Sequence, residues 1–125
     1  MPKPRLSLRN CVHRWFPAGL TVPLGSAFPD ETELVAIGVG RTAWVAIPGE
    51  LQSELGESLR RGAPAWERVF VAGVANDYLG YFLTPKGAAR PSYVACASVY
   101  GPGAGERVAR AAVGLLQRLA DGPDR

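Results

Sequence analysis

Residues 33–49 read Glu-Leu-Val-Ala-Ile-Gly-Val-Gly-Arg-Thr-Ala-Trp-Val-Ala-Ile-Pro-Gly, and they set the expected fold. Two β-branched, apolar runs (33–40 and 43–47) flank Gly40-Arg41, a pair that suits a tight hairpin turn. Because both runs are almost continuously apolar, we expect strands that are covered on both faces. This favours a layered α/β or α+β domain over an open two-faced sheet.

Two amphipathic helices are predicted after this hairpin. Leu51, Leu55 and Leu59 recur every four residues with charged residues between them, which predicts a helix ending near Gly62. From Glu106 to about residue 121 a second helix is predicted, because these apolar residues keep a 3.6-residue period: Val108, Ala111, Ala112, Leu115, Leu116 and Leu119.

A third apolar run at residues 68–74 predicts another buried strand, and residues 93–100 predict a further short extended segment. The expected fold class is therefore α/β, a layered mixed sheet of three to four strands with two amphipathic helices. Residues 1–29 contain five prolines and little periodicity, which predicts a proline-rich extended arm. Residues 30–121 form the body of the expected fold, and residues 122–125 are a tail.

Length, charge and cysteine spacing limit the class of protein. The 125 residues and 13.3 kDa fit one small domain. The chain has 14 Lys and Arg and 11 Asp and Glu, and these charged residues are scattered along the sequence. This distribution favours a solvated surface over a nucleic-acid interface, and a basic module for anionic lipid or nucleic acid is the weaker alternative.

Cys11, Cys96 and the single His13 do not have the spacing of a metal knuckle, and the sequence does not decide whether the two cysteines pair. No window predicts a transmembrane segment or a signal peptide, and localisation stays open.

No complete catalytic apparatus can be assembled from these residues. The glycine-rich residues 101–105 precede the last helix, whose N-terminus could cradle a phosphate, but they lack the Lys-Ser/Thr of a P-loop and favour a plain turn. Polar groups also follow two buried strands, in residues 47–50 and 76–81. Glu50 could bind a cation or stabilise the next helix N-terminus, and the tyrosines of the second segment could equally be core aromatics.

These two segments resemble the neutral/alkaline ceramidase family, the zinc-dependent amidohydrolases that split ceramide into sphingosine and a fatty acid. Residues 47–50, Ile-Pro-Gly-Glu, are similar to the family's Pro-Gly-Glu segment. Residues 71–81 are similar to its Ala-Gly-x-x-Asn-x-Tyr-x-x-Tyr block, and Tyr93 with residues 97–102 resembles its later Tyr and Ser-x-Tyr-Gly-Pro. The similarity covers about residues 30–120.

The resemblance implies a role for four residues. Glu50 and Tyr81 correspond to the carboxylate and the tyrosine that complete the family's zinc site, while Asn76 and Tyr78 are candidates to support those ligands or face the substrate. Zinc accepts nitrogen and oxygen ligands and can activate water or polarise an amide carbonyl. Nothing in the chain corresponds to the family's two upstream zinc histidines or its serine.

The chain is therefore expected to be the C-terminal portion of a ceramidase-like catalytic domain that acts on a ceramide-like lipid. On its own it should be inactive. The alternative is a non-catalytic remnant, or a small subunit that complements a separate N-terminal half. If that half is missing, an exposed sheet edge, an apolar face and self-association are expected.

Overall fold

The hairpin at residues 33–49 belongs to a three-stranded mixed sheet. The computed structural model describes residues 1–122, and in it the strand order is β3-β4-β6. The strands are β3 (Val35–Val39), β4 (Thr42–Ala46) and β6 (Arg68–Ala72). The β3–β4 pair is antiparallel and β4–β6 is parallel. The turn uses Gly40 at φ +60°, a backbone conformation that glycine adopts without strain, so the hairpin prediction is confirmed.

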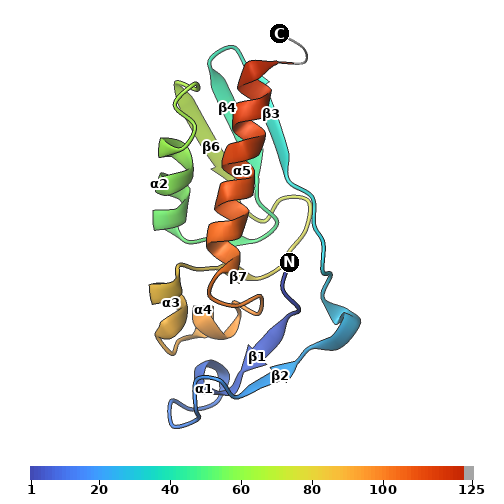
Figure 1. Cartoon of the computed structure of the whole chain (residues 1–125), viewed down its shortest axis with the longest axis vertical. Helices are drawn as coiled ribbons and strands as arrows, with labels where there is room; N and C mark the ends of the chain where they lie inside the picture. The colour runs from blue at the N-terminus through green and yellow to red at the C-terminus, as the bar shows by residue number, and fades with distance from the viewer. Residues whose placement is uncertain (123–125) are drawn as a thin grey trace.

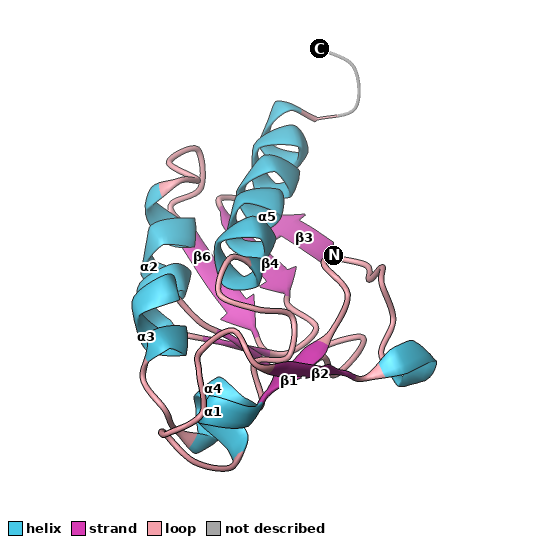
Figure 2. Cartoon of the chain, turned by 60° about the horizontal axis from the view of Figure 1, so that its bottom comes forward, coloured by secondary structure: helices cyan, strands magenta, loops and turns pink. Residues whose placement is uncertain are grey.

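Two amphipathic helices, α2 (Ser53–Arg61) and α5 (Ala104–Asp121), lie on the same face of this sheet (Figure 1 and Figure 2). Both were predicted, within about two residues at each end. The Trp66 indole donates a hydrogen bond of 2.9 Å to the Leu116 carbonyl, and Gly38 leaves room for the indole ring. The core between the sheet and the helices consists mainly of Ala43, Val45, Leu59, Val69, Val108, Ala112 and Leu116.

The opposite face of the sheet, which we call the open face, is uncovered within residues 1–122. It presents the alternate strand residues Val35, Ile37, Val39, Trp44 and Phe70, all of which are exposed. Ile37 is paired with Trp44 and Trp44 with Phe70, and the two aromatic rings stack with centroids 5.6 Å apart. The expectation of strands covered on both faces is therefore wrong for these residues. The exposed apolar face that is expected if an N-terminal half is missing is present in these residues.

Below the sheet in Figure 1, the chain forms a second group of short elements. The elements are β5 (Glu50–Leu51), β7 (Tyr81–Phe82), α3 (Pro85–Ala89) and α4 (Tyr93–Cys96), and β5 pairs with β7 in parallel. The prediction of an extended segment at residues 93–100 is wrong, since this segment begins with a helical turn. The reason is local: the Ser92 hydroxyl accepts a hydrogen bond of 3.1 Å from the Ala95 amide and so caps α4.

The N-terminal segment is more structured than an extended arm. It contains β1 (Arg5–Ser7), α1 (Leu8–Cys11), β2 (Thr21–Pro23) and the 3₁₀ turn η1 (Gly25–Ala27), and β1 pairs with β2 in an antiparallel hairpin. A disulfide between Cys11 and Cys96, which the sequence left open, joins α1 to α4. The Tyr100 hydroxyl donates a 2.8 Å hydrogen bond to the Pro29 carbonyl and holds the end of this segment against the core.

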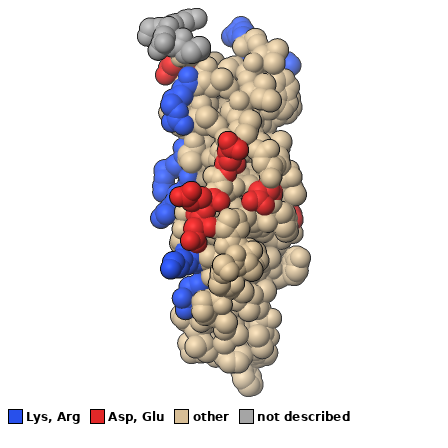
Figure 3. All heavy atoms as spheres, turned by 90° about the vertical axis from the view of Figure 1, so that its right-hand side faces the viewer, with Lys and Arg blue, Asp and Glu red and all other residues tan. Residues whose placement is uncertain are grey.

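Charge is unevenly distributed on the surface. In Figure 3, Lys and Arg follow one side of the view beside a group of acidic residues, whereas the opposite side carries few charges. Among residues 1–122, no helix has the length and apolarity to cross a membrane.

Candidate functional site

The structure brings together the two segments that the sequence analysis singled out. Glu50 and Tyr81 are register partners in the parallel β5–β7 pair, although they lie far apart in the chain. The Glu50 amide donates a 2.9 Å hydrogen bond to the Gly80 carbonyl, and the Leu79 amide donates one of 2.7 Å to the Pro48 carbonyl. The backbone after β4 and the backbone before β7 therefore run side by side at the candidate site.

Two glycines permit this close approach. A Cβ atom at Gly49 would lie 2.5 Å from the Gly80 carbonyl oxygen and 2.9 Å from the Phe82 ring. At Gly80, φ is +82° and a Cβ atom would collide with the Ala97 carbonyl oxygen. A larger residue at Gly49 would push β5 away from β7, and one at Gly80 would push β7 away from Ala97, so both glycines contribute to the placement of Glu50 beside Tyr81.

The Glu50 carboxylate influences the phenols of Tyr78 and Tyr81. The Tyr78 hydroxyl donates to Glu50 Oε1 at 3.3 Å. Desolvation, with the nearby Glu50 charge as the second cause, raises the pKa of Tyr78, and hydrogen bonding to Glu50 is the main reason that the pKa of Tyr81 is raised. Of the two phenols, Tyr78 is the one whose hydroxyl is hydrogen-bonded to Glu50. Both causes favour the neutral phenol, which can donate a proton to a hydrogen bond.

Glu50 and Tyr81 both line a cleft of about 440 Å³, whereas Asn76 and Tyr78 do not. Arg90 and Ser92 add a cation and a hydroxyl to its wall, and sequence reasoning missed both because no motif marks them. The remaining lining residues are Leu51, Gln52, Leu83, Gly87 and Val94. The cleft therefore offers one carboxylate, one phenol and one guanidinium to a ligand.

Asn76 lies in a strained loop rather than in the cleft. Its φ is +70°, and Val74, a β-branched residue, has φ +53°, in the left-handed region that costs non-glycine residues on the order of 1–3 kcal/mol. Both side chains are exposed. The loop is anchored by the Val74 and Ala75 amides, which donate to the carbonyls of Gly49 and Ile47 at 3.0 Å. Strain of this kind is common at functional sites, which keeps Asn76 a candidate to face a ligand.

The donor set falls short of a zinc site. Within residues 1–122, no group of three or more His, Cys, Asp and Glu side chains is placed to hold a metal ion. A catalytic zinc needs three protein ligands and an open position. His13 is exposed and packs against Trp15, with ring centroids 5.0 Å apart. Glu50 and Tyr81 can supply only part of a zinc coordination shell.

No family model and no curated protein matches this chain. The likeness to ceramidases thus stays a prediction from the motifs, and the argument for function is made from the residues of the cleft.

Proposed function

We propose that the chain contributes Glu50 and Tyr81 to the zinc centre of a ceramidase-type amidohydrolase, whose histidine ligands and nucleophile come from another polypeptide segment. The reaction would be hydrolysis of the amide of an N-acylsphingosine. The observation that carries the proposal is the pairing of Glu50 with Tyr81 across β5 and β7. The two residues that the resemblance nominates as ligands come from separate motifs, and nothing in either motif alone requires them to be neighbours.

The chain's own residues would position the ligands. The Tyr78 hydroxyl holds one oxygen of the Glu50 carboxylate, which leaves the other free for a metal. Tyr81 presents its phenol to the same cleft, and its ring packs edge-on against Tyr93 with centroids 6.1 Å apart. A bound zinc would supply Lewis-acid activation of water or of the amide carbonyl. Arg90 is placed in the cleft wall, where a cation can attract an anionic product.

The second candidate is a non-catalytic remnant of the family or a small complementing subunit. It is favoured by the incomplete donor set of residues 1–122 and by the open face of the sheet. The first candidate requires a further polypeptide for activity, whereas a remnant would have no activity to restore. The two candidates differ in whether Glu50 binds zinc.

A zinc titration followed by amide NMR tests this difference. We expect the amides of residues 50–51 and 81–82 to shift first, because the two oxygen donors lie in this pair of strands. Glu50→Gln should abolish the shifts. Glu54→Gln, an exposed carboxylate one turn further on, is the matched control and should preserve them.

Two results would contradict the proposal. One is a set of zinc-induced shifts at other carboxylates or at His13 with none at Glu50. The other is turnover of ceramide by the isolated 125-residue chain, since the proposal assigns the nucleophile to another segment.

A further inference from the structure

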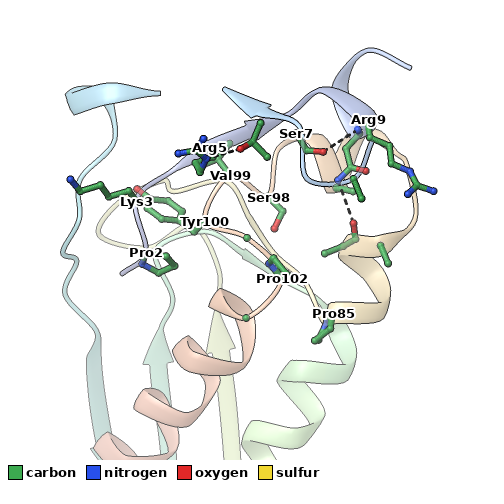
Figure 4. A pocket seen from close by; sticks show the side chains of 18 of the residues that line it. Pro2, Lys3, Arg5, Ser7, Arg9, Pro85, Ser98, Val99, Tyr100 and Pro102 are labelled. Atoms are coloured by element: carbon green, nitrogen blue, oxygen red, sulfur yellow. Dashed lines mark hydrogen bonds between the residues drawn. The ribbon is translucent and has the colours of Figure 1, made fainter. Parts of the chain in front are cut away.

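A second cavity lies beside the β1–β2 hairpin, and it is lined by none of Glu50, Asn76, Tyr78 and Tyr81. It has a volume of about 780 Å³ (Figure 4). The β1–β2 hairpin and α1 form one wall, residues 85–95 form another, and residues 98–103 with the first turn of α5 close the remaining side. The disulfide between Cys11 and Cys96 connects the first two walls.

The charged groups around this cavity are all basic. Lys3, Arg5, Arg9 and Arg107 line it, and no Asp or Glu of residues 1–122 does. The ion pairs formed within the described chain involve Arg41 and Arg61, so none of the four basic residues is neutralised by a carboxylate there. Four unneutralised cations around one cavity create a positive potential that attracts an anion.

Ser98 and Arg9 contribute polar side chains to the cavity wall. Ser98 is only 9% exposed and lines the cavity. Figure 4 shows its side chain directed into the cavity. The Arg9 Nε atom is buried without a hydrogen-bond partner in the described residues. Buried polar groups are usually hydrogen-bonded, so the unpaired Arg9 Nε atom indicates a missing acceptor.

The N-terminus of α5 adds further donors to the same cavity. Its N-cap, Gly103, lines the cavity and has no side chain that could satisfy the free backbone amides of the first turn. An 18-residue helix also carries a partial positive charge at this end. Glu106, the acidic residue of the first turn, does not line the cavity. Helix amides, guanidinium groups and a serine hydroxyl are the donors that carboxylate and phosphate groups accept from.

We propose that this cavity binds a small organic anion, a carboxylate or phosphate group joined to an apolar body. The anionic group would lie beside Ser98 and the α5 N-terminus, within the positive potential of the four basic residues. The apolar body would lie against the uncharged part of the wall, which includes Pro2, Ala88 and Pro102. Free inorganic phosphate has the same kind of anionic group but no apolar body, so contact with that apolar wall would add nothing to its affinity.

Isothermal titration calorimetry at low salt tests the proposal with hexyl phosphate, hexanoate, inorganic phosphate and hexanol. We expect the two organic anions to bind, and to bind tighter than inorganic phosphate and hexanol. Arg107→Gln should weaken the binding of hexyl phosphate by about fivefold, a loss typical of one exposed charge. Arg110→Gln, one turn further along α5 and outside the cavity, is the matched control and should leave affinity unchanged.

Ser98→Ala should also weaken binding severalfold without unfolding the chain, because it removes a single hydroxyl from the cavity wall. Far-ultraviolet circular dichroism checks the fold. Absence of binding by wild-type protein, equal affinity for hexanol and hexyl phosphate, or equal effects of the Arg107 and Arg110 variants would overturn the proposal. Inorganic phosphate that binds as tightly as hexyl phosphate would overturn the assignment of an organic ligand.

Discussion

The two faces of the β3-β4-β6 sheet are built from similar residues but have different surroundings. On the face toward α2 and α5, Ala43 and Val45 are completely buried. On the open face, Trp44 is 40% exposed and Ile37 is 59% exposed. Successive side chains of a strand point to opposite faces, so the hydrophobicity of the strands alone could not tell which face was covered. The comparison teaches that this sheet has apolar surface for a layer that residues 1–122 do not provide.

The largest expected effect contrasts one residue from each environment. Leu116 is fully buried between α5 and the sheet, and Leu116→Ala should lower the free energy of unfolding by about 2–5 kcal/mol because it leaves a cavity. Ile37→Ala on the open face should cost about 1 kcal/mol or less, since the side chain is already largely hydrated. Urea denaturation measures both. Equal losses of unfolding free energy in the Leu116 and Ile37 variants would mean that the open face is covered in solution.

A smaller loss is expected at Gly38, on the covered face of β3. A Cβ atom there would lie 2.5 Å from the Trp66 ring, so Gly38→Ala should cost about 1–3 kcal/mol through overpacking. Gly19→Ala is the matched control, because nothing lies within 4 Å of its Cβ position. A thermal melt compares the two variants. A neutral Gly38→Ala would contradict the close packing of Trp66 under the sheet.

The open face should affect self-association of the chain more than its stability. Exposed apolar patches beyond a few hundred Å² are rare on monomers, and we expect isolated wild-type chain to self-associate at high concentration. The double variant Trp44→Ser, Phe70→Ser should shift the sedimentation profile toward the monomer. Its unfolding free energy should fall by about 1 kcal/mol through loss of the stacked pair. A stable, sharply melting wild-type monomer at all concentrations would contradict the expectation.

The smallest expected effect on stability comes from the tyrosines of the candidate site, beyond the end of β4. The pKa of Tyr81 and that of Tyr78 are raised above their ordinary value of 10.0, so the folded state holds these protons more tightly than the unfolded state. Their contribution to stability is therefore complete below pH 10 and is lost as the pH rises above it. Glu50→Gln should bring both phenol pKa values down in an ultraviolet titration, whereas Glu54→Gln should not. Unchanged titration in the Glu50 variant would contradict the Glu50–tyrosine contacts.

The sequence predicted the sheet and both long helices because periodicity and turn residues report local structure. It placed the Gly40 turn correctly, and its apolar period located α5 over almost all of its length. It failed at residues 93–96, where the capping hydroxyl of Ser92 outweighs the β-branched and aromatic content. The disulfide between Cys11 and Cys96 depends on tertiary proximity across 85 residues, which no local pattern reports.

The candidate site was only partly predictable. Motif resemblance nominated Glu50 and Tyr81, and the β5–β7 pairing places them side by side. It could not indicate that Asn76 lies outside the cleft or that Arg90 lines it, because both depend on how the loops pack. The sequence indicates a glycine-rich turn before α5, but three of the four basic residues of the adjoining cavity come from the N-terminal segment, and no local pattern places that segment beside the turn.

The most direct test of the central claim is purification of the protein from its native source, with intact mass and zinc content measured on the same sample for wild type and Glu50→Gln. The account predicts that the chain is part of a species heavier than 13.3 kDa, either one polypeptide or a stoichiometric complex, with one zinc that the Glu50 variant loses. A lone 13.3 kDa species without zinc, or a zinc content unchanged in Glu50→Gln, would contradict it.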